Sequence, residues 1–503
     1  MKEELKMKKI IYNIIAIAAL AASVCACDLN EKKQGFVSTE DFFKTTEQCY
    51  ASLNSCYIPL KSIYTYTFFI ATECVTDLAY IASGTLDAQL DISPAKPRFG
   101  STVWTQCYTG IRNSNAAIAG IEKADFEDAD KVTLLGEGKI MRAMYYYLLT
   151  CFFGDVPFYT MEVNTVEKLQ EVARYPRMDA VTTRKELIKD LLSVVPNMEQ
   201  IRSSEVKNNR AGAAVGWMLI AKMAMWNKDW DQAIEACQAL EKIYGEIDQY
   251  PLEDIMFRNK NTPESILEIQ HTYTAGGLQY VSNVACVCTP THQGTTYIYD
   301  GVEIPELGNT ATTWSAARPN AFFHTGLMPK SSVDLRKNIY LAWDYNGQTF
   351  KSVSARPWTG PKFWCPNMAA QADGNNYKVF RYADVLLMLS ECYCEKQDEV
   401  KSIEYLNKIK NRAGIKPFTT FKTYIRLMEE IRKERGRELF GEFQRKFDLV
   451  RWGVWYTDTY AYTDYTTLKN NMQPFHRFYP IPDKEVVYSG YALDNKEYEQ
   501  GIE

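Results

Sequence analysis

Apolar residues recur at helical spacing, in steps near 3.6, over much of the chain. The stretches that carry this pattern are 49–60, 104–118, 134–153, 181–195, 381–412 and 422–440. The third of them ends at Gly154, with Pro157 close behind, which is typical of a helix C-terminus. The pattern therefore predicts a mainly α-helical protein.

Two of the helical segments show the spacing of tetratricopeptide units. In residues 211–245, the small residues Ala221 and Ala233 stand where two antiparallel helices would approach closely. Residues 389–409 repeat this spacing downstream. Paired helices of this kind indicate a stacked helical-repeat scaffold, and such repeats present surfaces to other proteins.

The helical pattern fades between roughly 250 and 375, where Gly, Pro, Thr and aromatic residues become frequent. Only a few short strands are expected there, such as Ile266–Gln270. Long irregular segments in compact proteins are usually functional. We therefore expect a loop-rich ligand-binding insertion at 251–375, between helical regions at 38–250 and 376–503.

The N-terminal stretch has the features of an export signal. A basic pair at 8–9 precedes an apolar run, Ile10–Ala22, that is too short to span a bilayer. Ala26 followed by Cys27 resembles a bacterial lipobox. Residues 1–26 are therefore predicted to be a lipoprotein signal peptide, with lipid on Cys27 and a lipidated tether over 27–37. A plain signal peptide cut elsewhere is the alternative.

The amino-acid composition limits the kinds of function that this protein can have. The net charge of −5 gives no electrostatic support for binding nucleic acid. After residue 22 no apolar run is long enough for a membrane helix. The 13 cysteines are scattered and define no disulfide framework, whereas 33 Tyr and 10 Trp suit contact with sugars or peptides.

Several motifs, in their order and spacing, resemble the SusD/RagB family of outer-membrane nutrient-binding lipoproteins. They are Gly138–Tyr147 leading to Pro157, Arg381–Met388 with Glu391, Leu406–Gly414, the charged stretch Ile431–Gly453, and Tyr479–Pro482 with Glu485. The resemblance implies about four tetratricopeptide-like helix pairs supporting a less regular subdomain. It also implies a lid on a SusC-like, TonB-dependent outer-membrane barrel. Such a lid captures an oligomer and hands it over without breaking a bond, and needs no cofactor.

Candidate ligand contacts are rings and polar side chains in the irregular segments. A ring stacks on the C–H face of a sugar or on a peptide side chain and loses little rotamer entropy. The residues chosen on this basis are Tyr80, Arg98, Tyr297, Tyr299, Trp314 and Asn320. Packing within the loops is the alternative for each of them.

Catalytic signatures are weak. The alternating charges at 434–451 are interpreted as a salt-bridged helix face, and Arg142 and Arg381 as partners of carboxylates or carbonyls. The sequence contains no H-E-x-x-H, G-x-S-x-G or phosphate-loop motif. The leading hypothesis is a non-enzymatic, outward-facing outer-membrane lipoprotein that binds a glycan, or a peptide in its place. A ligand-free scaffold for envelope proteins and a secreted polysaccharide hydrolase stay open.

Overall fold

The computed structural model describes residues 7, 42–81, 84–125, 128–274, 280–292, 294–419 and 423–499. The predicted signal peptide, the lipidated Cys27 and the tether lie outside the described residues and remain predictions. Within the described ranges, no helix combines the length and the apolar character needed to cross a bilayer.

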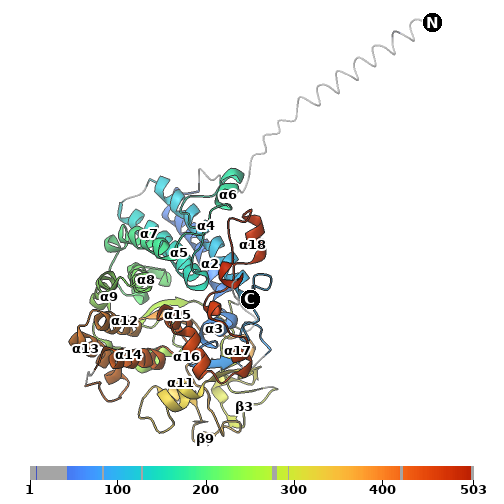
Figure 1. The fold of residues 1–503 in the computed structure, drawn as a ribbon, viewed down its shortest axis with the longest axis vertical. Coiled ribbons are helices and arrows are strands. Elements are labelled where there is room, and N and C mark those ends of the chain that lie inside the picture. The colour runs from blue at the N-terminus through green and yellow to red at the C-terminus, as the bar shows by residue number, and fades with distance from the viewer. Residues whose placement is uncertain are drawn as a thin grey trace.

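Helices that are close in sequence pack in pairs and form a stack (Figure 1). The paired helices are α2 (Thr46–Ile63) with α4 (Phe99–Lys123), α5 (Asp128–Phe153) with α7 (Ala180–Leu192), α8 (Ala213–Trp226) with α9 (Trp230–Tyr244), and α12 (Tyr382–Glu395) with α13 (Glu399–Arg412). Contacts of α5 with α8 and of α9 with α12 join neighbouring pairs, and α14 (Tyr424–Glu438) packs on α12. The predicted tetratricopeptide-like scaffold is confirmed.

Local sequence explains where these helices begin and how closely they approach. Asp179, Asp229 and Asp398 each accept a hydrogen bond from a backbone N–H in the first turn of α7, α9 and α13. Between α4 and α5, a Cβ atom added at Gly110 would lie 2.1 Å from the ring of Tyr145. Only glycine allows these two helices their close contact.

Shorter helices surround the stack. They are α3 (Tyr66–Glu73), α6 (Val166–Val172), α10 (Ala285–Cys288), α11 (Lys337–Tyr340), α15 (Arg445–Arg451), α16 (Trp455–Tyr462), α17 (Thr466–Asn471), α18 (Asp483–Tyr488) and α19 (Lys496–Glu499). In Figure 1, α6 and α18 lie at one end of the molecule, and α11 lies at the other with β3 and β9.

The strands are short and form two-stranded pairs. The antiparallel pairs are β1 (Ala79–Ile81) with β6 (Ala317–Pro319), β2 (Ser265–Ile269) with β12 (Tyr377–Arg381), β3 (Ile298–Tyr299) with β4 (Val302–Glu303), β7 (Leu341–Ala342) with β10 (Trp358–Thr359), and β8 (Asp344–Tyr345) with β9 (Gln348–Thr349). The parallel pair is β5 (Thr310–Ala311) with β11 (Ala369–Ala370). The predicted strand at 266–270 corresponds to β2, and the expected loop-rich segment with few short strands is observed.

The charged stretch at 434–451 differs in one respect from the expected salt-bridged helix face. Its ion pairs are present, but they are buried and join separate elements. Arg336 lies 2.8 Å from Glu434 and 2.6 Å from Glu438, and Arg381 lies 2.7 Å from Glu438. Burial works to raise the pKa of Glu438, but the surrounding guanidinium groups hold it well below its usual value. The cluster therefore fastens the irregular subdomain to the helical stack.

Arg142 and Arg381 were predicted to pair with carboxylates or carbonyls, and both make such contacts. The guanidinium of Arg142 donates to Asp190 at 2.5 Å and to the carbonyl of Thr160 at 3.2 Å. The Nε atom of Arg381 lies 2.9 Å from the carboxylate of Glu442. Both side chains therefore stabilise the fold.

Candidate functional site

Two contacts that involve aromatic rings lie where α2 is followed by α3. Tyr66, the first residue of α3, contacts Trp314 edge to face, with ring centroids 6.5 Å apart and planes at 88°. Trp314 keeps 41% of its surface exposed. Close by in the fold, the ammonium of Lys61 lies 3.5 Å from the ring centroid of Tyr280. We call Tyr66, Tyr280, Tyr297 and Trp314 the Trp314 surface.

The backbone on both sides of Trp314 is firmly held. The N–H of Thr313 donates to the carbonyl of His292 at 3.1 Å, and the Trp314 N–H donates to that of Cys286 at 2.8 Å. The hydroxyl of Ser315 donates to the carbonyl of Thr289. Because Thr313 and Ser315 point inward and are buried, Trp314 between them points outward. A ring presented in this way needs little ordering when a ligand binds.

His292 connects the segment of Tyr297 to that of Trp314. Its two ring nitrogens lie 2.6 Å from the carbonyl oxygen of Ala311 and 2.7 Å from that of Thr296. Tyr299 stacks on the imidazole with centroids 4.3 Å apart and is fully buried. Tyr297, two positions earlier, is 43% exposed. Stacking on His292 therefore takes Tyr299 into the core and leaves Tyr297 outside.

A buried carboxylate supports the segment beneath the rings. Asp373 accepts hydrogen bonds from the N–H groups of Asn375 at 2.9 Å and Ala285 at 3.3 Å, and its backbone pairs with Ser282. Burial raises the pKa of Asp373 to about 6. This residue fixes the start of α10, whose Cys286 carbonyl holds Trp314.

The remaining predicted residues lie in less open positions. Tyr80 is 5% exposed, stacks on Tyr465 and has the Arg356 guanidinium 5.5 Å from its ring centroid. Arg98 is paired with Asp91 at 2.7 Å. Asn320 is fully buried and donates to the carbonyl of Thr76, while its own oxygen accepts from the Asp464 N–H. In this structure Tyr297 and Trp314 are the two predicted residues that present open ring faces.

Three residues of the site, Tyr66, Lys61 and Tyr280, were not selected from the sequence. Tyr66 and Lys61 lie in helical segments, and no local pattern separates Tyr66 from Tyr64, which is 3% exposed and belongs to the core. Their role depends on the distant segments that carry Trp314 and Tyr280.

Another contact between a cationic side chain and an aromatic ring lies beside β1. The Arg318 guanidinium stacks 3.3 Å from the ring centroid of Trp358, and its Nη1 atom is buried without a hydrogen bond among the described residues. Burial lowers the pKa of Arg318 to about 10, although Asp300 works in the other direction. At neutral pH the Arg318 side chain is therefore cationic, and its Nη1 group has no hydrogen-bond acceptor among the described residues.

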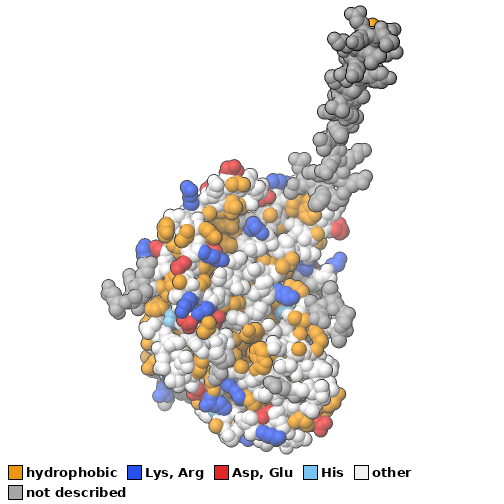
Figure 2. All heavy atoms as spheres, turned by 90° about the vertical axis from the view of Figure 1, so that its right-hand side faces the viewer, with side chains coloured by type: hydrophobic (Ala, Val, Ile, Leu, Met, Phe, Trp, Pro, Cys, Tyr) orange, Lys and Arg blue, Asp and Glu red, His pale blue; other side chains and the backbone are white. Residues whose placement is uncertain are grey.

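Figure 2 views the molecule from the side on which α17, α18 and β3 lie in Figure 1. Hydrophobic side chains gather there in several separate patches, interspersed with lysine and arginine side chains. No cluster of three or more potential metal ligands occurs in the described part of the chain. Ring faces with nearby cationic donors suit non-covalent binding of molecules that have both C–H faces and hydroxyl or carbonyl groups.

The fold and its ring-bearing surface define a class, that of helical-repeat proteins with an irregular, aromatic-rich subdomain on the stack. A family model described as "SusD family" matches residues 366–498, and a second, described as "Starch-binding associating with outer membrane", matches residues 3–198. The chain belongs to the SusD/RagB family.

Relatives cover most of the chain. SusD-like protein P25 of Formosa agariphila is 24% identical in an alignment 449 residues long, and the match covers 81% of this chain and 81% of that protein. A SusD homolog from Bacteroides thetaiotaomicron has a TM-score of 0.75 at 18% identity, covering 92% of this chain and 98% of that one. Surface glycan-binding protein A from the same organism, solved in complex with laminarihexaose, has a TM-score of 0.69 at 18% identity, covering 89% and 98%.

Proposed function

We propose that this protein is a non-enzymatic, lipid-anchored protein of the outer cell surface that binds a glycan and delivers it to a SusC-like, TonB-dependent barrel. The observation that carries the proposal is the exposed Trp314 ring, held by buried neighbours against Tyr66. An open ring on a rigid backbone suits a sugar face, because neither partner loses much conformational freedom.

Two structural relatives support the choice of ligand class. One was solved with laminarihexaose, and another is described as a laminarin-binding SusD-like protein. Carboxylates that could suggest hydrolysis, such as Glu434 and Glu438, are engaged in buried ion pairs. The proposed ligand surface contains rings and cations, which suit binding.

A glycan array with the full-length protein in detergent tests the binding step. Wild type should bind at least one neutral oligosaccharide family, and Trp314→Ala should weaken that binding. Tyr488→Ala is the matched control, because it removes a ring that is 74% exposed on α18. If no glycan binds while a peptide array gives a signal, the ligand is a peptide. If both arrays are silent and Trp314→Ala still assembles with its envelope partners, the scaffold function is correct.

The anchor and the barrel need separate experiments. Cys27→Ala should leave the protein unretained in membranes, and a variant that stays tightly bound would place the anchor elsewhere. A pull-down from native membranes should recover a large β-barrel with the lipoprotein, and repeated recovery of the lipoprotein alone would count against delivery. Release of products from a polymer, abolished by one carboxylate substitution, would establish the hydrolase alternative.

A further inference from the structure

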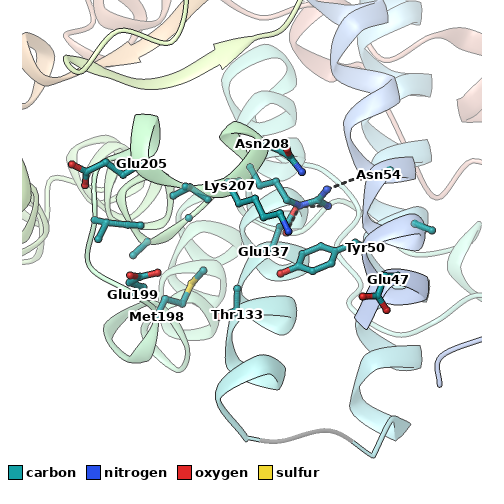
Figure 3. A pocket seen from close by; sticks show the side chains of 17 residues that line it. Glu47, Tyr50, Asn54, Thr133, Glu137, Met198, Glu199, Glu205, Lys207 and Asn208 are labelled. Atoms are coloured by element: carbon teal, nitrogen blue, oxygen red, sulfur yellow. Dashed lines mark hydrogen bonds and ion pairs between the residues drawn. The ribbon is translucent and has the colours of Figure 1, made fainter. Parts of the chain in front are cut away.

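Two cavities lie side by side along α2, and the second of them is lined in part by Tyr280 of the Trp314 surface. The first has a volume of about 540 Å³ and lies between α2, α5 and the segment before α8 (Figure 3). The second has a volume of about 330 Å³ and lies between α2 and β2. Asn54, Asn208 and Arg210 line both cavities, so the two form one groove.

One face of α2 forms a wall of this groove. The lining residues Glu47, Tyr50, Asn54, Tyr57 and Lys61 follow one another in steps of three and four, which places them on one helical face. At about 1.5 Å per residue, this face is roughly 20 Å long. Its far end reaches Lys61, whose ammonium covers the ring of Tyr280. The groove therefore continues into the Trp314 surface.

The opposite wall carries two asparagines in an unusual backbone conformation. Asn208 has φ 60° and Asn209 has φ 52°, in the left-handed region. Asparagine tolerates this region better than most residues, but two in succession are uncommon, and such conformations occur often at ligand sites. Neither side chain makes a hydrogen bond within the described residues, so the amide of Asn208 is available at the junction of the two cavities.

The side chains at the bottom of the groove are polar, and their opposite charges form an ion pair. The Nε atom of Arg210 lies 2.8 Å from both oxygens of Glu137, and its Nη1 atom donates to Asn54 at 2.7 Å. Its Nη2 atom is buried and lies 2.7 Å from Glu137. Burial works to lower the pKa of Arg210, but Glu137 raises it above its usual value, so Arg210 stays cationic.

The rim selects against anionic ligands. Glu47, Glu199 and Glu205 line the first cavity, and Lys207 is the cation beside them (Figure 3). In Figure 3, Tyr50 points into the cavity from α2. An aromatic ring, free amides and a neutralised ion pair suit the hydroxyl groups of an uncharged sugar, and the surplus of carboxylates repels sulfated or uronic acid chains.

We infer that the groove along α2 is a second section of the ligand site, which takes the continuation of a neutral oligosaccharide whose other end lies on the Trp314 surface. This inference rests on the proposed glycan binding. It adds that affinity rises with chain length until the oligomer reaches the first cavity.

The test compares short and long probes on matched variants. The probes are laminaritriose and soluble laminarin, titrated calorimetrically against the full-length protein in detergent. If the array selects another neutral polymer, its trisaccharide and the polymer itself replace them. The variants are Tyr50→Ala and Asn208→Gly, because glycine keeps the positive φ and removes only the amide. Asn346→Gly is the control, since Asn346 has φ 49° in the exposed turn between β8 and β9.

Both groove variants should lose about threefold to tenfold in affinity for the polymer, the effect of one lost contact, and keep wild-type affinity for the trisaccharide. Trp314→Ala should weaken both probes, and Asn346→Gly neither. Wild-type affinity of Tyr50→Ala and Asn208→Gly for the polymer would overturn the inference and leave the proposed function standing. Wild-type protein that binds no glycan on the array would instead remove the proposed function itself.

Discussion

Replacing Trp314 by alanine tests the ring surface most directly. A tryptophan side chain offers about 250 Å² of surface, so its 41% exposure corresponds to roughly 100 Å². A sugar that covers one face removes about half of this area from water, and at about 25 cal/mol per Å² the contact contributes roughly 1.3 kcal/mol. Trp314→Ala should therefore raise the Kd about tenfold.

The assay has two readouts, because a loss of binding must be separated from a loss of folding. Calorimetric titration with the glycan that binds best on the array gives the Kd, and urea unfolding gives the free energy of unfolding. The part of Trp314 that is already buried is roughly 150 Å², which corresponds to about 4 kcal/mol at about 25 cal/mol per Å², and the edge-to-face contact with Tyr66 contributes about 1 kcal/mol more. The variant should therefore lose at most roughly 5 kcal/mol in stability, and the titration is made under conditions where unfolding shows it to be folded.

Two results would refute the reasoning. If Trp314→Ala binds with wild-type affinity, the ligand does not lie on this ring. If the affinity falls only as far as the unfolded fraction of the variant explains, Trp314 is needed for the fold and its exposed face is incidental. Tyr488→Ala should change neither quantity, because Tyr488 is exposed and lies outside the proposed surface.

Three further predictions concern stability. Asn320→Ala should lower the free energy of unfolding by about 2 kcal/mol, because it removes two buried hydrogen bonds, and should leave the Kd unchanged; the reverse pattern would make Asn320 a ligand contact. Gly110→Ala should cost about 3 kcal/mol in urea unfolding through its clash with Tyr145, whereas Gly84→Ala, which meets nothing within 4 Å, should be nearly neutral. The native state binds the proton of Asp373 more tightly, with a pKa of about 6 against 3.8 unfolded. As the pH rises through this whole range, from well below 3.8 to well above 6, wild type should therefore lose about 3 kcal/mol relative to Asp373→Asn. A wild-type minus variant difference that stays flat with pH would contradict this.

The helical scaffold could be predicted because its signals are local. A 3.6-residue apolar period reports which face of a helix is buried, and Gly154 marks a helix end by its own backbone freedom, with φ 70° in the structure. The pairing of α8 with α9 also follows from local features, since Ala221 and Ala233 are both fully buried.

The residues of the binding site could be predicted from the sequence less well than the helical scaffold. Tyr297 and Tyr299 stand two positions apart in an irregular segment, yet one is 43% exposed and the other is buried. The difference comes from His292, which stacks on Tyr299 and bonds the carbonyl of Ala311. Nothing in the residues around either tyrosine indicates that partner.

The sequence by itself determined the helix pairs, the irregular middle segment, the family and the kind of side chain suited to a ligand. Tertiary structure alone decided which rings face outward and that α2 shares a groove with Asn208. Helix formation depends on neighbours three and four positions away, so a pattern in the chain reveals it. A binding surface depends on contacts between segments more than a hundred residues apart, such as the hydrogen bond between Tyr57 and Ala211, and no local pattern encodes them.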